Sequence, residues 1–361
     1  AWLPSDTMPM RFILRTPWGA AVSRDVVDGR WAEPTGEAGD VVGADLWALP
    51  GLVDAHAHLA SDALFAPGDF ESALERARQA LSAGVTLIID KGWCDDTTIR
   101  VAAALDPSER PDIEAARRII AVPDGYYPDF GLEVGPDVLE ERVKEEAEAG
   151  LGWVKVVGDW PRRGKGPVTN FTEEELRRVV ASAEGTGAKV AVHTMAPDTP
   201  STAVAAGVHS IEHGLFLTED DIATLGKRRG IWVPTLLRVE ELIVQLGPQS
   251  SGGRLLAEGL ENMRRLLPLA PETGVHVLAG TDLVGSPADV AAEALKMGEY
   301  GLSPLQVAAA VGSSGHEATG RSTSFDPGSP ADAVLFPVNP GEEPGVLAHP
   351  KLVVRRGRIL D

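Results

Sequence analysis

The chain of 361 residues contains one cysteine, Cys94, so no disulfide can form within it. A zinc site built from several cysteines is excluded for the same reason. A reactive thiol needs a base beside it, and none is visible next to Cys94 in the sequence. The chemistry of the chain is therefore expected from other residue types.

Basic residues are also scarce. The chain has 33 Lys and Arg against 53 Asp and Glu, which gives a formal net charge of −20. A field of this sign repels nucleic acids and anionic membrane surfaces, so the sequence argues against both as partners. We expect a small-molecule substrate, and the sequence leaves open whether the chain forms a homo-oligomer.

Long apolar runs are absent, and none approaches the ~18 residues of a membrane span. The first ten residues, AWLPSDTMPM, lack the basic and then apolar pattern of a secretory signal. We therefore expect a soluble, cytoplasmic protein.

The middle of the chain repeats one unit, in which a helical stretch and a glycine precede a short apolar run. The units are LSAGVTLIID, AEAGLGWVKVV, GTGAKVAVH, AAGVHSIEH, KRRGIWVPT and PETGVHVLAGTD. Their glycines suit the left-handed position that ends a helix, and we assign this role to Gly84, Gly150, Gly187, Gly207, Gly230 and Gly274. The apolar runs are typical of parallel strands that are buried on both faces.

With residues 52–58 and 117–122, the chain has eight predicted strands in an α/β pattern. Eight such units predict a closed (β/α)8 barrel of the TIM type. A doubly wound open sheet is the alternative, but it usually carries a glycine loop after its first strand, and DAHAHLASDA is not one. Asp69 is the expected N-cap of one helix, and Thr172 with Glu175 forms a capping box for another.

The two chain ends differ from the middle, because they read as short antiparallel strands with turns. Neither end can form a stable sheet alone. We therefore predict one composite β-sandwich domain from residues 1–48 and 324–361, beside a barrel of residues 49–323.

Polar residues fall at the carboxyl ends of the predicted strands, where a barrel brings side chains together at its reactive face. Imidazole and carboxylate groups are metal ligands, and their joint occurrence there makes coincidence improbable. The other histidines either begin strands (His209, His276) or follow the eighth strand (His316, His349), and we assign none of them as ligands. The residues at the strand ends are His56, His58, Lys155, His193, His213 and Asp282.

Lys155 lies in the apolar run GWVKVV, although the chain has few lysines. Desolvation would lower the pKa of its amine and leave it neutral and nucleophilic. Such an amine can add CO₂ to form a carbamate, whose two oxygens can bridge two metal ions. A buried ion pair with Asp282 or Asp54 is the alternative.

Together these residues resemble the amidohydrolase superfamily. The order of GWVKVV, AAGVHSIEHG and GTD is most similar to the branch of imidazolonepropionase-like hydrolases and prolidase-type dipeptidases. That resemblance implies a distorted (β/α)8 barrel with a composite β-sandwich. The matching motifs cover nearly the whole chain: PGLVDAHAH at 50–58, VKVV at 154–157, SIEHG at 210–214, GTD at 280–282 and DPGSPADAVLF at 326–336.

The resemblance also implies a centre of two divalent metal ions, expected to be zinc. Asp282 would take a proton from the attacking water and pass it to the leaving group. A hydroxide would bridge the two ions. As ligands, the resemblance implies His56, His58 and Asp282 for the more buried ion, His193 and His213 for the more exposed ion, and N6-carboxylated Lys155 for both.

Two loops bear on the substrate. Prolidase-type dipeptidases, as the resemblance implies, carry a histidine in the loop after strand three, but AVPDGYYPDFG at 121–131 has none. Tyr126 or Tyr127 is a candidate to bind the substrate carbonyl in its place. The loop GDWPRRGKGPVTNF follows strand four, and its Arg162, Arg163 and Lys165 either clamp a substrate carboxylate or form a solvated surface.

The leading interpretation is a metal-dependent hydrolase that cleaves an amide, cyclic amide, carbamate or lactone bond of a small molecule. A Xaa-Pro or other dipeptidase is the first alternative. A mononuclear deaminase of the same superfamily is another, but that class generally lacks the strand-four lysine. A non-catalytic scaffold is the third, and it would have no reason to retain every ligand position.

Overall fold

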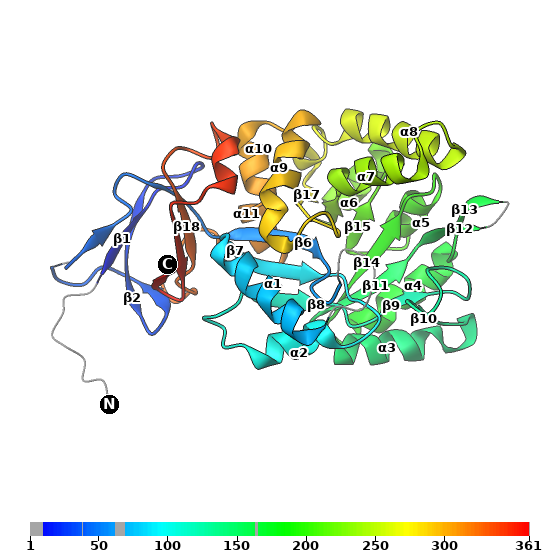
Figure 1. Ribbon diagram of the computed structural model, residues 1–361, viewed down its shortest axis with the longest axis horizontal. Helices are drawn as coiled ribbons and strands as arrows, with labels where there is room; N and C mark the ends of the chain where they lie inside the picture. Colours follow the sequence, from blue (N-terminus) through cyan, green and yellow to red (C-terminus); the bar gives the residue numbers. More distant parts are fainter. Residues whose placement is uncertain (1–9, 38, 62–68, 163–164, 361) are drawn as a thin grey trace.

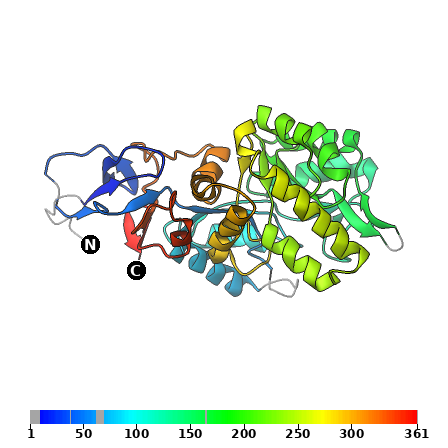
Figure 2. The same ribbon diagram turned by 90° about the horizontal axis from the view of Figure 1, so that it is seen from above.

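The computed structural model describes residues 10–37, 39–61, 69–162 and 165–360. Figure 1 shows a small strand-rich part that contains both chain ends and a larger α/β part that contains the rest. Seen from above in Figure 2, the two parts lie end to end. The predicted α/β class is confirmed.

The larger part is built on parallel strands in two hydrogen-bonded sheets. One sheet has the order β6-β7-β8, with β6 (Leu52–Ala57), β7 (Val85–Asp90) and β8 (Asp112–Ala115). The other has the order β10-β9-β11-β14-β15-β16-β17. Its strands are β9 (Ile119–Ala121), β10 (Leu132–Glu133), β11 (Trp153–Val157), β14 (Lys189–Thr194), β15 (Ser210–His213), β16 (Ile231–Val233) and β17 (His276–Val277).

Backbone contacts connect the edges of these two sheets. Ala55 N donates to Ala279 O at 2.9 Å, and Asp282 N donates to His56 O at 2.8 Å, so the segment after β17 runs along β6. At the other edge, Ala115 at the end of β8 pairs in parallel with Gly152, directly before β11. The strand predicted at 117–122 is shorter than expected, and β8 is an additional strand directly before it.

Helices cover the outside of the strands in both views. Asp69 accepts a hydrogen bond from Ser72 N, and Thr172 and Glu175 form a reciprocal capping box, so both cap predictions are confirmed. No helix in the described ranges is long and apolar enough to span a membrane. The helices are α1 (Phe70–Ser82), α2 (Thr97–Ala104), α3 (Leu139–Ala149), α4 (Glu173–Glu184), α5 (Thr199–Ala205), α6 (Glu219–Lys227), α7 (Leu236–Leu246), α8 (Ser251–Leu266), α9 (Val290–Glu299), α10 (Pro304–Ala310) and α11 (Ser313–Ala318), with 3-10 helices η1 (Pro136–Val138), η2 (Pro271–Thr273), η3 (Pro287–Asp289) and η4 (Pro344–Ala348).

The chain ends form two four-stranded sheets, β3-β2-β1-β4 and β20-β19-β18-β5. Their strands are β1 (Arg11–Leu14), β2 (Val22–Val27), β3 (Arg30–Ala32), β4 (Val41–Val42), β5 (Trp47–Leu49), β18 (Ala333–Phe336), β19 (Leu352–Arg355) and β20 (Arg358–Leu360). One buried cluster joins both ends of the chain, including Phe12 and Trp31 from the first and Phe325, Leu335 and Val354 from the last. Strand β1 pairs with β4 in parallel, which differs from the antiparallel arrangement predicted for this region.

Candidate active site

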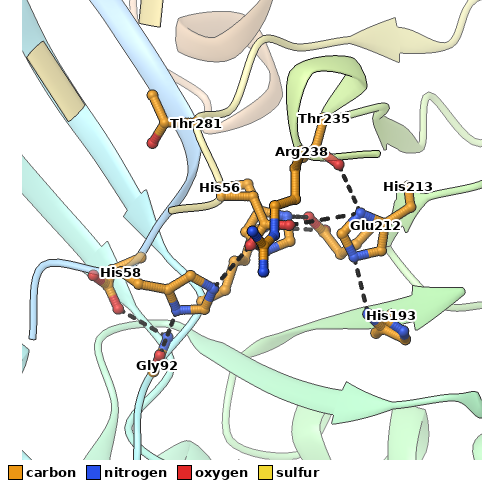
Figure 3. Close-up of polar contacts among 12 residues, drawn as sticks. His56, His58, Gly92, His193, Glu212, His213, Thr235, Arg238 and Thr281 are labelled. Carbon is orange, nitrogen blue, oxygen red and sulfur yellow. Dashed lines mark hydrogen bonds and ion pairs between the residues drawn. The ribbon is translucent and has the colours of Figure 1, made fainter. Parts of the chain in front are cut away.

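His56 and His58 lie near each other at the end of β6 (Figure 3), and Asp282 lies close to both. His56 lies in β6 and His58 directly follows it, and the Nε2 atom of each lies 3.4 Å from Asp282 Oδ1. One ligand atom from each of these residues lies within 4.8 Å of the others. Within the described ranges this is the one group of three or more such residues that could hold a metal ion.

The second ring nitrogen of each histidine has its own partner. His56 Nδ1 lies 2.6 Å from Glu212 Oε2, and His58 Nδ1 lies 2.7 Å from the carbonyl oxygen of Gly92. Partners of this kind fix the ring orientation of metal-binding histidines and direct the other nitrogen to the ion. The three residues therefore fit a divalent metal ion in donor chemistry and in orientation.

The other two predicted histidines form an adjacent pair. His193 lies in β14 and His213 ends β15, with His213 Nε2 2.9 Å from His193 Nδ1. His213 Nδ1 contacts Thr235 Oγ1 at 2.6 Å and lies 3.8 Å from Asp282 Oδ2. Asp282 thus has one carboxylate oxygen toward His56 and His58 and the other toward His213.

Lys155 lies in the middle of β11 with 3% of its surface exposed. Its Nζ atom has no hydrogen-bond partner among the described residues. The ion pair with Asp282 or Asp54 that was the alternative is not observed there, and Asp54 instead accepts from Thr281 Oγ1 at 2.6 Å. Burial lowers the pKa of Lys155 from 10.5 to about 8, although Glu212 opposes this shift.

Burial also decides the charge of the imidazoles. It lowers the pKa of His56 from 6.5 to about 4 and that of His213 to about 3. Burial alone would raise the pKa of Asp282, but His56 and the hydrogen bond from His58 hold it well below 3.8. Near pH 7, His56 and His213 are therefore neutral and Asp282 is ionised, which are the protonation states that bind metals.

Glu212 and Lys91 belong to this site, although the sequence analysis assigned neither. Glu212 is fully buried, and its Oε1 lies 3.2 Å from Lys91 Nζ. The Lys91 ammonium lies 4.5 Å from the centre of the Trp153 ring. A charged residue in an apolar strand was the signal that identified Lys155, and the same reasoning applies to Glu212 in HSIEH.

A cavity of about 520 Å³ opens at this site. All six of the polar residues predicted at the strand ends line it, and so do Tyr126 and Tyr127. The loop after β11 is a hairpin of β12 (Asp159–Arg162) and β13 (Gly166–Thr169). Trp160 and Pro167 of this hairpin also line the cavity.

The predicted basic cluster of that loop is placed differently. Arg162 is not among the residues that line the cavity, and its guanidinium donates to Asn170 Oδ1 at 2.8 Å and to the carbonyl oxygen of Pro123 at 3.3 Å. Lys165 is exposed and does not line the cavity, and Arg163 lies outside the described residues. Instead, Arg238 of α7 lines the cavity, and nothing in its local sequence marked it.

The four histidines that were not assigned as ligands lie elsewhere. His209 directly precedes β15, His276 begins β17, His316 lies in α11 and His349 follows η4. None of these four lines the cavity. Burial raises the pKa of the Cys94 thiol, which does not favour a reactive thiolate.

The chain is similar in sequence and in fold to known proteins. The model of the amidohydrolase family matches residues 47–360. Uncharacterized protein Rv2915c of Mycobacterium tuberculosis is 33% identical over 368 residues, which cover 96% of this chain and 94% of that protein.

Two solved structures illustrate the shared fold. A Xaa-Pro dipeptidase with bound methionine has a TM-score of 0.80 at 21% identity, covering 98% of this chain and 99% of that one. Ochratoxinase from A. niger has a TM-score of 0.79 at 18% identity, covering 98% and 96%. The predicted superfamily is confirmed, and the chain belongs to the amidohydrolase family.

Proposed function

We propose that the protein is a metal-dependent hydrolase that cleaves an amide, cyclic amide, carbamate or lactone bond of a small molecule. The observation that carries this proposal is the convergence of His56 Nε2, His58 Nε2 and an Asp282 carboxylate oxygen within 4.8 Å. Membership of the amidohydrolase family supports hydrolysis as the reaction.

We propose that the scaffold is a closed (β/α)8 barrel of residues 49–323 with a composite β-sandwich of residues 1–48 and 324–361. The backbone contacts between β6 and the segment after β17, and between β8 and the residues before β11, support closure. In such a barrel the carboxyl ends of the strands form the catalytic face.

We propose that two divalent metal ions, expected to be zinc, are held at this face. The Nζ atom of Lys155 is buried at the cavity without a hydrogen-bond partner among the described residues, and the lowered pKa favours the neutral amine that carboxylation requires. Neutral His193 and His213 offer a second pair of nitrogen donors, of which His213 lies 3.8 Å from Asp282. His56, His58 and Asp282 would hold one ion, His193 and His213 would hold the other, and N6-carboxylated Lys155 would supply an oxygen ligand to each.

Metal ions bound here would polarise the scissile carbonyl and lower the pKa of water. Asp282 stays ionised because of its histidine neighbours, so it can accept the proton of the attacking water. The same carboxyl group then donates this proton to the leaving group. Tyr126, Tyr127 and Trp160 form an aromatic wall of the cavity.

Dipeptide hydrolysis is a second candidate, because the fold matches that of a Xaa-Pro dipeptidase. The loop at 121–131 argues against it, since it brings tyrosines to the cavity and contains no histidine.

The test combines metal counting with a hydrolysis screen of N-acyl amino acids, dipeptides, carbamates and lactones. We expect about two metal ions per chain by elemental analysis, hydrolysis of at least one substrate class, loss of activity after chelation and its return with zinc. His193→Asn should lose metal, whereas His209→Asn, which changes a histidine outside the cavity, should not. One ion per chain would favour a deaminase, and unchanged hydrolysis by metal-free protein would refute the mechanism.

A further inference from the structure

The walls of the cavity are mainly hydrophobic. Trp160 packs against Tyr126 and Tyr127, with ring centroids 4.7 Å apart in both pairs. Leucines of α7 and α8 line another part of the cavity, including Leu242 and Leu256. A cavity of about 520 Å³ with such walls suits a bulky apolar or aromatic group.

Most of the charged groups in the cavity already have a role. Lys155 and Asp282 belong to the proposed metal centre, and an Asp159 oxygen accepts from Met195 N at 2.8 Å and Ala196 N at 2.9 Å. Among the described residues that line the cavity, Arg238 is the one arginine. A guanidinium on a mainly hydrophobic wall of the cavity, beside the proposed metal centre, matches an anionic group on the ligand.

Arg238 is also held in a defined position. It lies in the first turn of α7, where Leu236 N and Leu237 N donate to the carboxyl oxygens of buried Glu293 at 2.6 and 3.0 Å. Its side chain is 7% exposed, and Nη1 donates to Glu241 Oε2 at 2.8 Å. In Figure 3 the side chain extends from its helix toward the histidines.

We infer that Arg238 binds a carboxylate of the substrate, and that the substrates are acids with a bulky apolar group next to the scissile bond. N-acyl or N-carbamoyl derivatives of hydrophobic amino acids are the simplest members of this class. Arginine presents parallel N–H groups that match the two oxygens of a carboxylate. This inference rests on the proposed hydrolase function, since it names the substrate class of the same site.

Binding of matched ligands tests the inference without turnover. The probes are 3-phenylpropanoate and its neutral amide, 3-phenylpropanamide, titrated calorimetrically into the metal-loaded protein. Because a charge-assisted pair is at stake, we expect the acid to bind at least ~10-fold more tightly than the amide. Arg238→Met should bring this ratio to about one.

The matched control is Arg142→Met. Arg142 pairs with Glu145 three residues further along α3, as Arg238 pairs with Glu241, but its side chain is 42% exposed and it does not line the cavity. The ratio should be unchanged in this variant. A ratio that survives in folded Arg238→Met protein would show that another group, such as a metal ion, holds the carboxylate, and would overturn the inference.

Kinetics separates this inference from the proposed function. With N-acetyl-L-phenylalanine, Arg238→Met should raise KM at least ~10-fold with a smaller change in kcat, and the corresponding amide should show no such rise. If no substrate is hydrolysed, the proposed function fails, while the acid-to-amide ratio still reports on Arg238. If Arg238→Met does not fold, Arg238→Lys and the wild-type ratio decide, and a wild-type ratio near one refutes carboxylate recognition.

Discussion

The buried pair of Glu212 and Lys91 allows a quantitative test of how the metal centre is supported. The two residues are 0% and 1% exposed, and Glu212 Oε1 lies 3.2 Å from Lys91 Nζ. On its other side, Glu212 Oε2 lies 2.6 Å from His56 Nδ1. Lys91→Met removes the ion pair alone, whereas Glu212→Gln removes both the ion pair and the carboxylate that orients His56.

The loss of folding stability expected for each variant depends on the partners that the remaining charge keeps. Removing one partner of a buried ion pair generally costs ~3–5 kcal/mol, because the other charge stays buried. After Glu212→Gln, the Lys91 ammonium still lies 4.5 Å from the centre of the Trp153 ring, so we expect the free energy of unfolding to fall by ~3–4 kcal/mol. After Lys91→Met, Glu212 keeps contacts with His56 and Ser210, so we expect ~2–3 kcal/mol. The double variant should cost at least ~2 kcal/mol less than the sum of the two single variants.

Two assays separate stability from metal binding. Urea unfolding of metal-free protein gives the stability terms, and competition with a chelator gives the metal affinity. We expect Glu212→Gln to weaken metal binding ~10–100-fold and Lys91→Met to leave it within ~3-fold, because Glu212 alone touches a ligand. Lys144→Met is the control, since Lys144 pairs with Glu148 at the surface, where both are more than half exposed. Additive costs of the two single variants, or equal losses of metal affinity, would refute this account.

Three further predictions concern single residues. Lys155→Ala should lose most of the bound metal and activity, and added acetate or propionate should restore part of both if the lysine is carboxylated; metal content near that of the wild type would contradict a bridging role. Asp282→Asn should lower kcat by ~10²-fold or more while a substrate analogue still binds, and unchanged turnover would exclude Asp282 as the base. Burial raises the pKa of Glu293 from 4.5 to about 8, so folded protein keeps a proton that unfolded chain releases between these values. The contribution of protonated Glu293 to the free energy of unfolding is on the order of 5 kcal/mol. It is present below pH 4.5 and is lost as the pH rises through 8. In denaturation experiments from pH 4 to 9, Glu293→Gln should reduce this loss of stability at high pH. Glu299→Gln, which changes an exposed residue, should not.

Local patterns predicted much of the fold. The apolar runs and capping residues identified the parallel strands and two helix starts, because a continuous apolar run and an N-cap hydrogen bond are both visible in neighbouring residues. The third strand was less predictable. We expected it to begin at Arg117 and Arg118, but both guanidinium groups donate to Glu146 of α3. Contacts between residues so distant in sequence leave no local signal.

The helix-ending glycines show the same limit. Gly84, Gly187, Gly207 and Gly274 have positive φ angles, as predicted. The prediction was wrong for Gly150, whose φ is −84°. It was also wrong for Gly230, because the preceding residue, Arg229, takes the left-handed conformation with φ 54°.

The sequence predicted only part of the candidate site. The residues that the strand ends place there were identified, but Arg238 was not, because it reaches the cavity from the first turn of α7. Arg162, which stood out by charge, is held by Asn170 and Pro123 instead. Charge alone identified a basic residue in a loop but did not indicate the direction of its side chain.

Backbone strain explains why Glu212 was missed. Strand alternation places Glu212 and His213 on opposite faces of β15, so only one of them is expected in the site. His213 has φ 64°, a conformation that costs a non-glycine residue ~1–3 kcal/mol. Its ring therefore turns into the site beside Glu212.

Thr235 and Asp282 share this conformation, with φ 48° and 42°. All three residues lie where a strand or its extension ends at the cavity, and buried hydrogen bonds hold them. Trp232 Nε1 donates to His213 O at 2.7 Å, Thr235 Oγ1 contacts His213 Nδ1 at 2.6 Å, and Asp282 N donates to His56 O at 2.8 Å. The surrounding fold thus stabilises a strained arrangement that ideal strands would not adopt, and this arrangement brings the side chains of neighbouring strands to one point.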